Sequence, residues 1–182
     1  LSSATASPPG GTELDYLNTE LQSPASTSQG VTSMHIRQEI AIEAPRQTLW
    51  DLLTCRIDDW WTHPYRVQDR DSTMRLELAP HGSLAERWDD EGFATWGQVS
   101  QLDPGTTLEL TGPCGMGAVH GVYTFHVQDE DGGVLVTLTH DAFGPIREDV
   151  QRTFEDAWQH MLARLKELAE GKLAYGAEAR TI

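Results

Sequence analysis

Two polar side chains, a histidine and a tyrosine, fall on what the pattern predicts to be an apolar face. Residues 132–143 read GGVLVTLTHDAF, an alternating strand that runs into His140 and Asp141. Neighbouring side chains in a strand point to opposite faces, so these two residues cannot form a catalytic relay with each other. If the Asp-Gly dipeptide at 131–132 forms a two-residue hairpin turn, Tyr123 lies directly opposite His140 on the inward face.

A buried tyrosine and a buried histidine each require a hydrogen-bond partner, because an unpaired polar group in an apolar environment is costly. Tyr123 and His140 could satisfy each other or bind a water molecule. They could also orient one polar group of an otherwise apolar ligand, as pockets commonly do. In an enzyme they would be the best acid–base pair of this chain, and Glu86 could join them if it faces the same way.

Other motifs that carry chemistry are absent or weak. His120 and His126 share a strand face but lie roughly 20 Å apart, which is too far for one metal ion. The sequence contains no dinucleotide fingerprint, phosphate-binding loop or nucleophile elbow. We therefore expect no metal and no cofactor. The glycine-rich loop 111–117 is most simply a connector, in which Met116 could flank a cavity mouth and Cys114 could be reactive if exposed.

The elements that must position these residues follow from hydrophobic periodicity and turn signals. A strand begins near residue 34, a short helix spans 46–54, and the DDWW segment at 58–61 makes a second helical turn. Alternating segments separated by Gly, Pro and Asp turns then predict about six consecutive strands between residues 72 and 143. Residues 147–171 carry one apolar stripe at helical spacing, long enough to cross the sheet. The order predicts an α+β fold in which a curved antiparallel sheet is covered by a long C-terminal helix.

Composition limits the classes of partner. The 182 residues suffice for one domain, and the formal net charge of −15 disfavours nucleic acid and anionic membrane surfaces. No apolar run reaches the length of a membrane span. The two cysteines are far apart, which favours a reducing compartment, and we expect a cytoplasmic protein. Residues 1–33 are rich in Ser, Thr, Pro and Gly and predict a disordered tail, residues 34–171 form the domain, and 172–182 form a flexible C-terminal tail.

Five segments, taken in order, resemble the SRPBCC superfamily (START and Bet v 1-like proteins), and more narrowly bacterial proteins similar to the C-terminal domain of the Hsp90 ATPase activator. The segments are IRQEIAIEAPRQTLWDLLT, DWW, WGQVSQLDPGTTLELTGP, VLVTLTHDAFG and AWQHMLARLKELAEG, and the resemblance spans about residues 34–171. It implies a helix-grip fold with six to seven strands, two short helices after the first strand, and a cavity between sheet and C-terminal helix. It supplies no catalytic residues.

The resemblance and the pattern together favour a module that binds a small apolar molecule. Two alternatives remain open: a cyclase or hydrolase that uses His140 as acid or base, and a chaperone-associated or stress-related interaction protein. The protein could also form a homodimer. The tryptophans are most simply core or lid residues, and the same positions would line a cavity. The candidate ligand-binding residues are Trp60, Trp61, Trp96, Met116, Tyr123, Phe125, His140 and Trp158.

Overall fold

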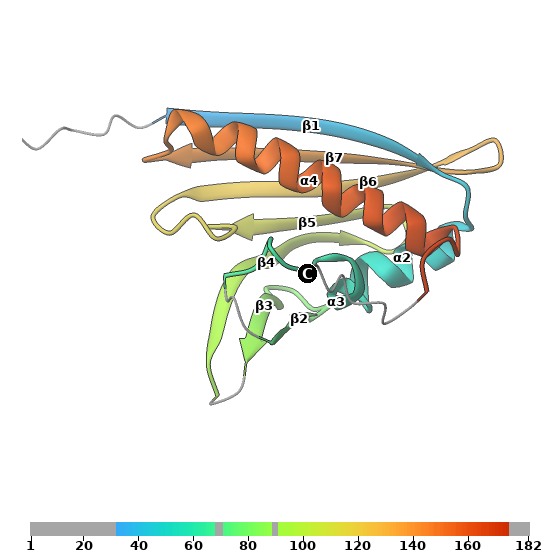
Figure 1. Ribbon diagram of the computed structural model, residues 1–182, viewed down its shortest axis with the longest axis horizontal. Coiled ribbons are helices and arrows are strands. Elements are labelled where there is room, and N and C mark those ends of the chain that lie inside the picture. The colour runs from blue at the N-terminus through green and yellow to red at the C-terminus, as the bar shows by residue number, and fades with distance from the viewer. Residues whose placement is uncertain (1–31, 68–70, 89–90, 175–182) are drawn as a thin grey trace, which may run out of the picture.

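The computed structural model describes residues 32–67, 71–88 and 91–174, which form one antiparallel sheet and three helices (Figure 1). The strand order in the seven-stranded sheet is β1-β7-β6-β5-β4-β3-β2. The strands are β1 (Thr32–Ile42), β2 (Ser72–Leu76), β3 (Ser83–Trp88), β4 (Phe93–Asp103), β5 (Thr107–Gly112), β6 (His120–Glu130) and β7 (Gly133–Gly144). The helices are α2 (Arg46–Thr54), α3 (Ile57–Trp60) and α4 (Glu148–Ala169).

The predicted meander is confirmed, since β2 to β7 follow one another along the chain as neighbours in the sheet. The first strand crosses over to pair with the last, so β1 and β2 are the two edges. The β6–β7 hairpin has the register that its Asp-Gly turn predicts. Glu130 pairs with Gly133 around the turn, and Tyr123 pairs with His140 farther along. A two-residue turn leaves no freedom to slip the register, which is why this detail can be read from sequence.

The core lies between the sheet and α4, which crosses in front of β7 and β6 with α2 beside its C-terminal end (Figure 1). The predicted helical stripe faces inward. Trp158, Leu162, Leu165 and Leu168 are all buried against strand residues such as Phe125. Within the described residues, no helix combines the length and the apolar character that crossing a membrane requires.

The boundaries differ slightly from those that the sequence predicts. β1 begins at Thr32, so Thr32 and Ser33 belong to the sheet although the sequence suggested that the tail ends at residue 33. Residues 1–31 and 175–182, which make up most of the two predicted tails, lie outside the described residues. Asp58 lies inside α3. Its Oδ1 accepts a hydrogen bond from the backbone N–H of Met74 at 2.6 Å and ties α3 to β2.

Side chains at the C-terminal end of α4 bind the backbone at the end of β1. Lys166 Nζ donates to the carbonyl of Ala41 at 2.5 Å, and the carboxylate of Glu170 accepts from the backbone N–H of Glu43 at 2.9 Å. Both backbone groups are engaged by these side chains and are not available to another strand. This edge is therefore partly blocked against pairing with another strand.

Candidate functional site

Tyr123 and His140 lie side by side on the inner face of the sheet, as neighbours across β6 and β7. Neither side chain is exposed, and their ring centroids are 5.5 Å apart. They do not satisfy each other. Tyr123 Oη and His140 Nε2 are both buried and have no hydrogen-bond partner among the residues that the structure describes. Two neighbouring unpaired polar atoms in a core are unusual and require an explanation.

His140 is held from the helix side by Trp158. The indole Nε1–H of Trp158 donates to His140 Nδ1 at 3.1 Å, and the two ring centroids are 5.9 Å apart. Burial lowers the pKa of His140 from 6.5 to about 4, and the nearby charge of Asp141 opposes this only partly. The ring is therefore neutral at physiological pH.

Tyr123 has an equally apolar environment. Burial raises the pKa of Tyr123 well above its ordinary value, and proximity to Cys114 raises it further. Cys114 is itself fully buried, and burial raises the pKa of its thiol. The sequence suggested a reactive thiol if Cys114 were exposed. Because it is buried and protonated, Cys114 is a packing residue beside the tyrosine rather than a nucleophile.

Glycines from three strands clear the space around the unpaired atoms. A side chain at Gly97 on β4 would come within 2.3 Å of Tyr123 Oη, and one at Gly121 on β6 would come within 3.2 Å of His140 Nε2. Gly112 on β5 pairs with Gly121, and a side chain there would come within 2.6 Å of the Gly97 backbone. The Tyr123 hydroxyl can reach its position only because residue 97 has no side chain. Sequence reasoning missed these glycines, since their adjacency depends on strand pairing.

The candidate tryptophans form one aromatic cluster under α4. Trp61 contacts Trp96 and Trp158 edge-on, with centroid distances of 5.2 Å and 5.3 Å. Phe125 packs edge-on against Trp60 and Trp158, each at 5.9 Å. The structure thus brings together five of the eight predicted residues in addition to the Tyr123–His140 pair.

All four indole N–H groups of this aromatic cluster have acceptors. Trp60 donates to the carbonyl of Leu52 at 2.8 Å, and Trp61 donates to the carbonyl of Tyr65 at 2.7 Å. Trp96 donates to the carboxylate of Glu86 at 3.3 Å, and Trp158 donates to His140 as described above. Among the described residues, the atoms of the site without a hydrogen-bond partner are therefore those of Tyr123 and His140, not the indole nitrogens of the tryptophans.

Glu86 does not join the Tyr123–His140 pair. It is fully buried on β3, and its Oε2 accepts from the backbone N–H of Val67 at 2.8 Å as well as from Trp96. The carboxylate thus fastens the segment after α3 to the sheet. An acid–base relay from His140 to Glu86 is absent from the hydrogen bonds of the described residues.

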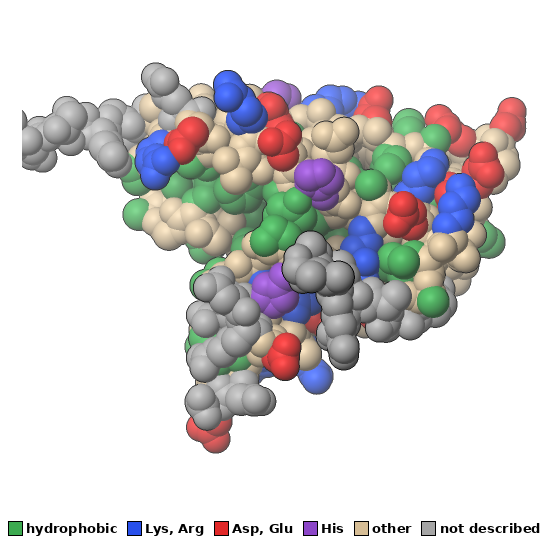
Figure 2. All heavy atoms as spheres, in the orientation of Figure 1, with side chains coloured by type: hydrophobic (Ala, Val, Ile, Leu, Met, Phe, Trp, Pro, Cys, Tyr) green, Lys and Arg blue, Asp and Glu red, His purple; other side chains and the backbone are tan. Residues whose placement is uncertain are grey.

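The side of the site nearest to solvent lies along the N-terminal half of α4. Phe154 is only partly buried, and its ring packs edge-on against His140 at 5.4 Å. Met116, Ile146 and Val150 are also partly buried against the core. Figure 2 shows hydrophobic side chains reaching the surface along this half of the helix. Met116 is therefore at the border of the core, where the sequence suggested a cavity mouth.

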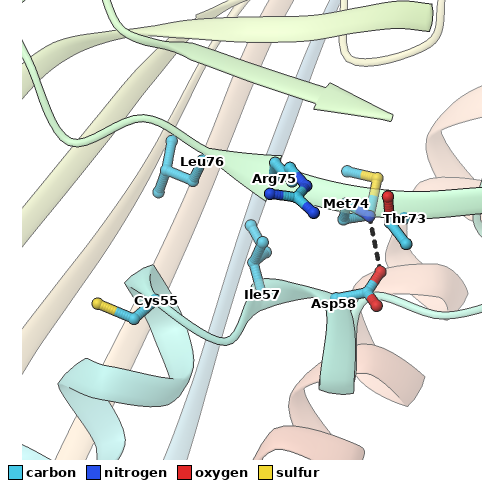
Figure 3. A pocket seen from close by; sticks show the side chains of 7 residues that line it. All are labelled: Cys55, Ile57, Asp58, Thr73, Met74, Arg75 and Leu76. Atoms are coloured by element: carbon cyan, nitrogen blue, oxygen red, sulfur yellow. Dashed lines mark hydrogen bonds between the residues drawn. The ribbon is translucent and has the colours of Figure 1, made fainter. Parts of the chain in front are cut away.

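A separate pocket of about 320 Å³ lies at the opposite edge of the sheet, between β2 and the α2–α3 segment (Figure 3). Ile57 and Met74 form its apolar part, and Asp58 is held there by its bond to the Met74 backbone. Cys55 lies at its rim. None of the predicted site residues lines this pocket. The described residues contain no group of three or more His, Cys, Asp or Glu side chains that could hold a metal ion.

The antiparallel sheet that grips a long C-terminal helix defines a helix-grip protein. The sequence profile described as "Activator of Hsp90 ATPase homolog 1-like protein" matches residues 43–170. The chain therefore belongs to this family, within the SRPBCC superfamily. No curated protein matches the sequence.

Solved structures agree with the fold. Protein MLL2253 from Mesorhizobium loti superposes with a TM-score of 0.60 at 18% identity, covering 77% of this chain and 99% of that one. Aha1 from Colwellia psychrerythraea, described as a dimer in solution, has a TM-score of 0.54 at 20% identity, covering 75% and 96%. Protein EF2215 from Enterococcus faecalis, of unknown function, has a TM-score of 0.58 at 18% identity, covering 92% and 89%. Identities this low establish the fold, and function must be argued from the site.

Proposed function

We propose that the protein binds a small, mainly apolar molecule between the sheet and the N-terminal half of α4, with its polar group held by Tyr123 and His140. The observation that carries this proposal is the pair of buried, unpaired atoms, Tyr123 Oη and His140 Nε2. Each unpaired buried group costs about 1–3 kcal/mol, and a ligand that pairs both would recover that cost.

The surroundings suit such a ligand. Phe125 and Trp158 supply apolar area next to the polar pair, which matches the usual composition of small-molecule sites. Phe154 packs edge-on against His140 and is itself only partly buried, so the site lies close to the surface on this side.

Binding is favoured over catalysis by the same contacts. A histidine that acts as general acid or base needs a second polar group within reach to position or reprotonate it. The one hydrogen bond of the His140 side chain within the described residues comes from Trp158, an indole that does not titrate. Among the described residues, no hydrogen bond joins His140 to a second titratable group, so the contacts support binding better than the cyclase or hydrolase alternative.

Native mass spectrometry of freshly purified protein, followed by solvent extraction, tests the proposal. We expect a reproducible additional mass from a small apolar compound. Tyr123→Phe should reduce its occupancy. Tyr65→Phe should not, because Tyr65 bonds to His160 on the outer side of α4. Absence of bound mass, together with a flat thermal-shift series over apolar acids, ketones and sterols, would contradict the proposal.

Self-association is a separate proposal. The Colwellia relative is described as a dimer. If this chain also dimerises, we propose that it uses a surface other than the edge of β1, where Lys166 and Glu170 already bind the backbone. Light scattering on the intact chain and on Lys166→Ala would show whether freeing that edge promotes association.

A further inference from the structure

The hydrogen bond from Trp158 determines which nitrogen of His140 carries the proton. An indole N–H can only donate, so His140 Nδ1 must accept. A neutral imidazole carries one proton, which therefore resides on Nε2. The unpaired atom of His140 is thus an N–H donor that points into the apolar interior.

Tyr123 offers a second donor beside it. Burial raises the pKa of its hydroxyl, so the proton stays on Oη at any physiological pH. The hydroxyl has no acceptor among the described residues. Tyr123 and His140 occupy paired positions on adjacent strands. Their free atoms border Gly97 and Gly121, which are joined through Gly112, so both donors open onto one glycine-lined part of the inner face.

The surroundings disfavour a charged ligand. The burial that lowers the pKa of His140 to about 4 would also penalise a carboxylate or an ammonium group placed beside it. The charged group closest in sequence, Asp141, faces the other side of the sheet and binds His35 there at 2.5 Å. A carbonyl oxygen, by contrast, has two lone pairs and no net charge, and can accept from both donors.

We infer that the bound molecule is a neutral carbonyl compound, a ketone, aldehyde or ester on an apolar skeleton, whose oxygen accepts hydrogen bonds from His140 Nε2–H and Tyr123 Oη–H. This inference rests on the proposed function and adds the chemical class of the ligand. Trp158 acts as a positioning residue, because it directs the histidine proton toward the ligand.

Two measurements on the full chain test the inference. Long-range proton–nitrogen NMR spectra, assigned with His140→Gln, report which ring nitrogen of His140 is protonated. Titrations then compare four probes on one skeleton: naphthyl methyl ketone, the isosteric hydrocarbon isopropenylnaphthalene, naphthoate and naphthylethylammonium. We expect Nε2 to be protonated and the ketone to bind about tenfold more tightly than the hydrocarbon. Tyr123→Phe should remove most of that preference, and the matched variant Tyr65→Phe should keep it.

Trp158→Phe supplies a second check. It removes the indole donor while keeping an aromatic ring, so the proton of His140 should redistribute between the two nitrogens and the preference for the ketone should fall. Protonation of Nδ1 in the unaltered chain, or equal binding of ketone and hydrocarbon, would overturn the carbonyl inference and leave the proposed function standing. Binding by none of the four probes would overturn the proposed function, and the inference would fall with it.

Discussion

The two halves of α4 pack on the same sheet but use their side chains differently. In the C-terminal half, Leu162, Leu165 and Leu168 are at most 2% exposed. Polar side chains at this end are engaged as well, since Lys166 binds the carbonyl of Ala41 in β1 and Glu170, just after the helix, binds the N–H of Glu43. These three leucines leave no apolar surface uncovered, and this half fastens the helix to the sheet.

The side chains in the N-terminal half of α4 are less fully buried and hydrogen-bonded. Val150 and Phe154 are only partly buried, and the N-cap residue Arg147 makes no side-chain capping bond. Trp158 is buried but donates to a histidine whose other nitrogen is unpaired. One continuous helical stripe therefore has a half that is fully buried and a half that borders unpaired polar atoms. The predictions below test this difference.

Replacing a side chain by alanine should lower the free energy of unfolding by different amounts in the two halves of α4. Leu165→Ala removes a fully buried side chain, and we expect a loss of about 2–5 kcal/mol in the free energy of unfolding. Phe154→Ala should cost clearly less, although it removes more atoms, because that side chain is partly exposed. Urea denaturation at neutral pH measures both. Equal losses would show that the N-terminal half is as tightly packed as the C-terminal half.

Mild acid should act through the N-terminal half. The folded-state pKa of His140 is lowered by burial from 6.5 to about 4, so between these values the unfolded chain binds a proton that the folded chain does not. Stability should therefore fall by about 2–4 kcal/mol as the pH drops from 6.5 to 4, and this contribution should level off below that range. His140→Gln should lose this part of the pH dependence. If stability depended on pH in the same way in this variant, another group would be responsible for the titration.

Stronger acid should act through the C-terminal half. The pKa of Glu170 is lowered from 4.5 to about 2, first by the hydrogen bond from Lys172 and then by the backbone N–H of Glu43. Its stabilising contribution is complete above pH 4.5 and is lost as the pH falls toward 2. We expect Glu170→Gln to cost about 1–2 kcal/mol at neutral pH and to flatten the profile in that lower range. Thermal unfolding across the acid range compares the variant with the parent chain, and parallel curves would count against the role of Glu170.

The smallest effect on stability should come from the hydroxyl of Tyr123. Because Tyr123 Oη has no partner, Tyr123→Phe should change the free energy of unfolding by less than about 0.5 kcal/mol or increase it. Tyr65→Phe is the matched control, since its hydroxyl bonds to His160 Nδ1 at 2.5 Å. A loss above about 1.5 kcal/mol for Tyr123→Phe, measured on ligand-free protein, would mean that the hydroxyl is already paired in the free chain.

Local sequence signals predicted much of this fold. The helix at 46–54 was predicted with the bounds that the structure shows, and the turn at 131–132 determined the register that sets Tyr123 opposite His140. These features depend on neighbouring residues and on short-range turn geometry, which a single sequence contains.

Local signals could not predict which face of the sheet the side chains of Glu86 and Trp96 occupy. The pairing of β3 with β4 shifts register at Leu84–Ala85, and the pairing of β4 with β5 shifts between Val99 and Gln101. A register shift interrupts the alternation of faces, so Glu86 is buried directly after the buried Ala85. Period-two reasoning fails at such positions.

The sequence by itself determined the order of elements, the inward apolar face and the place of Tyr123 and His140 on it. Only the tertiary structure decided what those two residues contact. Trp158 reaches His140 from the helix, and Gly97 admits the tyrosine hydroxyl from a strand two places away in the sheet. The physical reason is that a hydrogen bond depends on the position and direction of single atoms, and segments distant in sequence acquire that geometry only when the sheet and helix pack together.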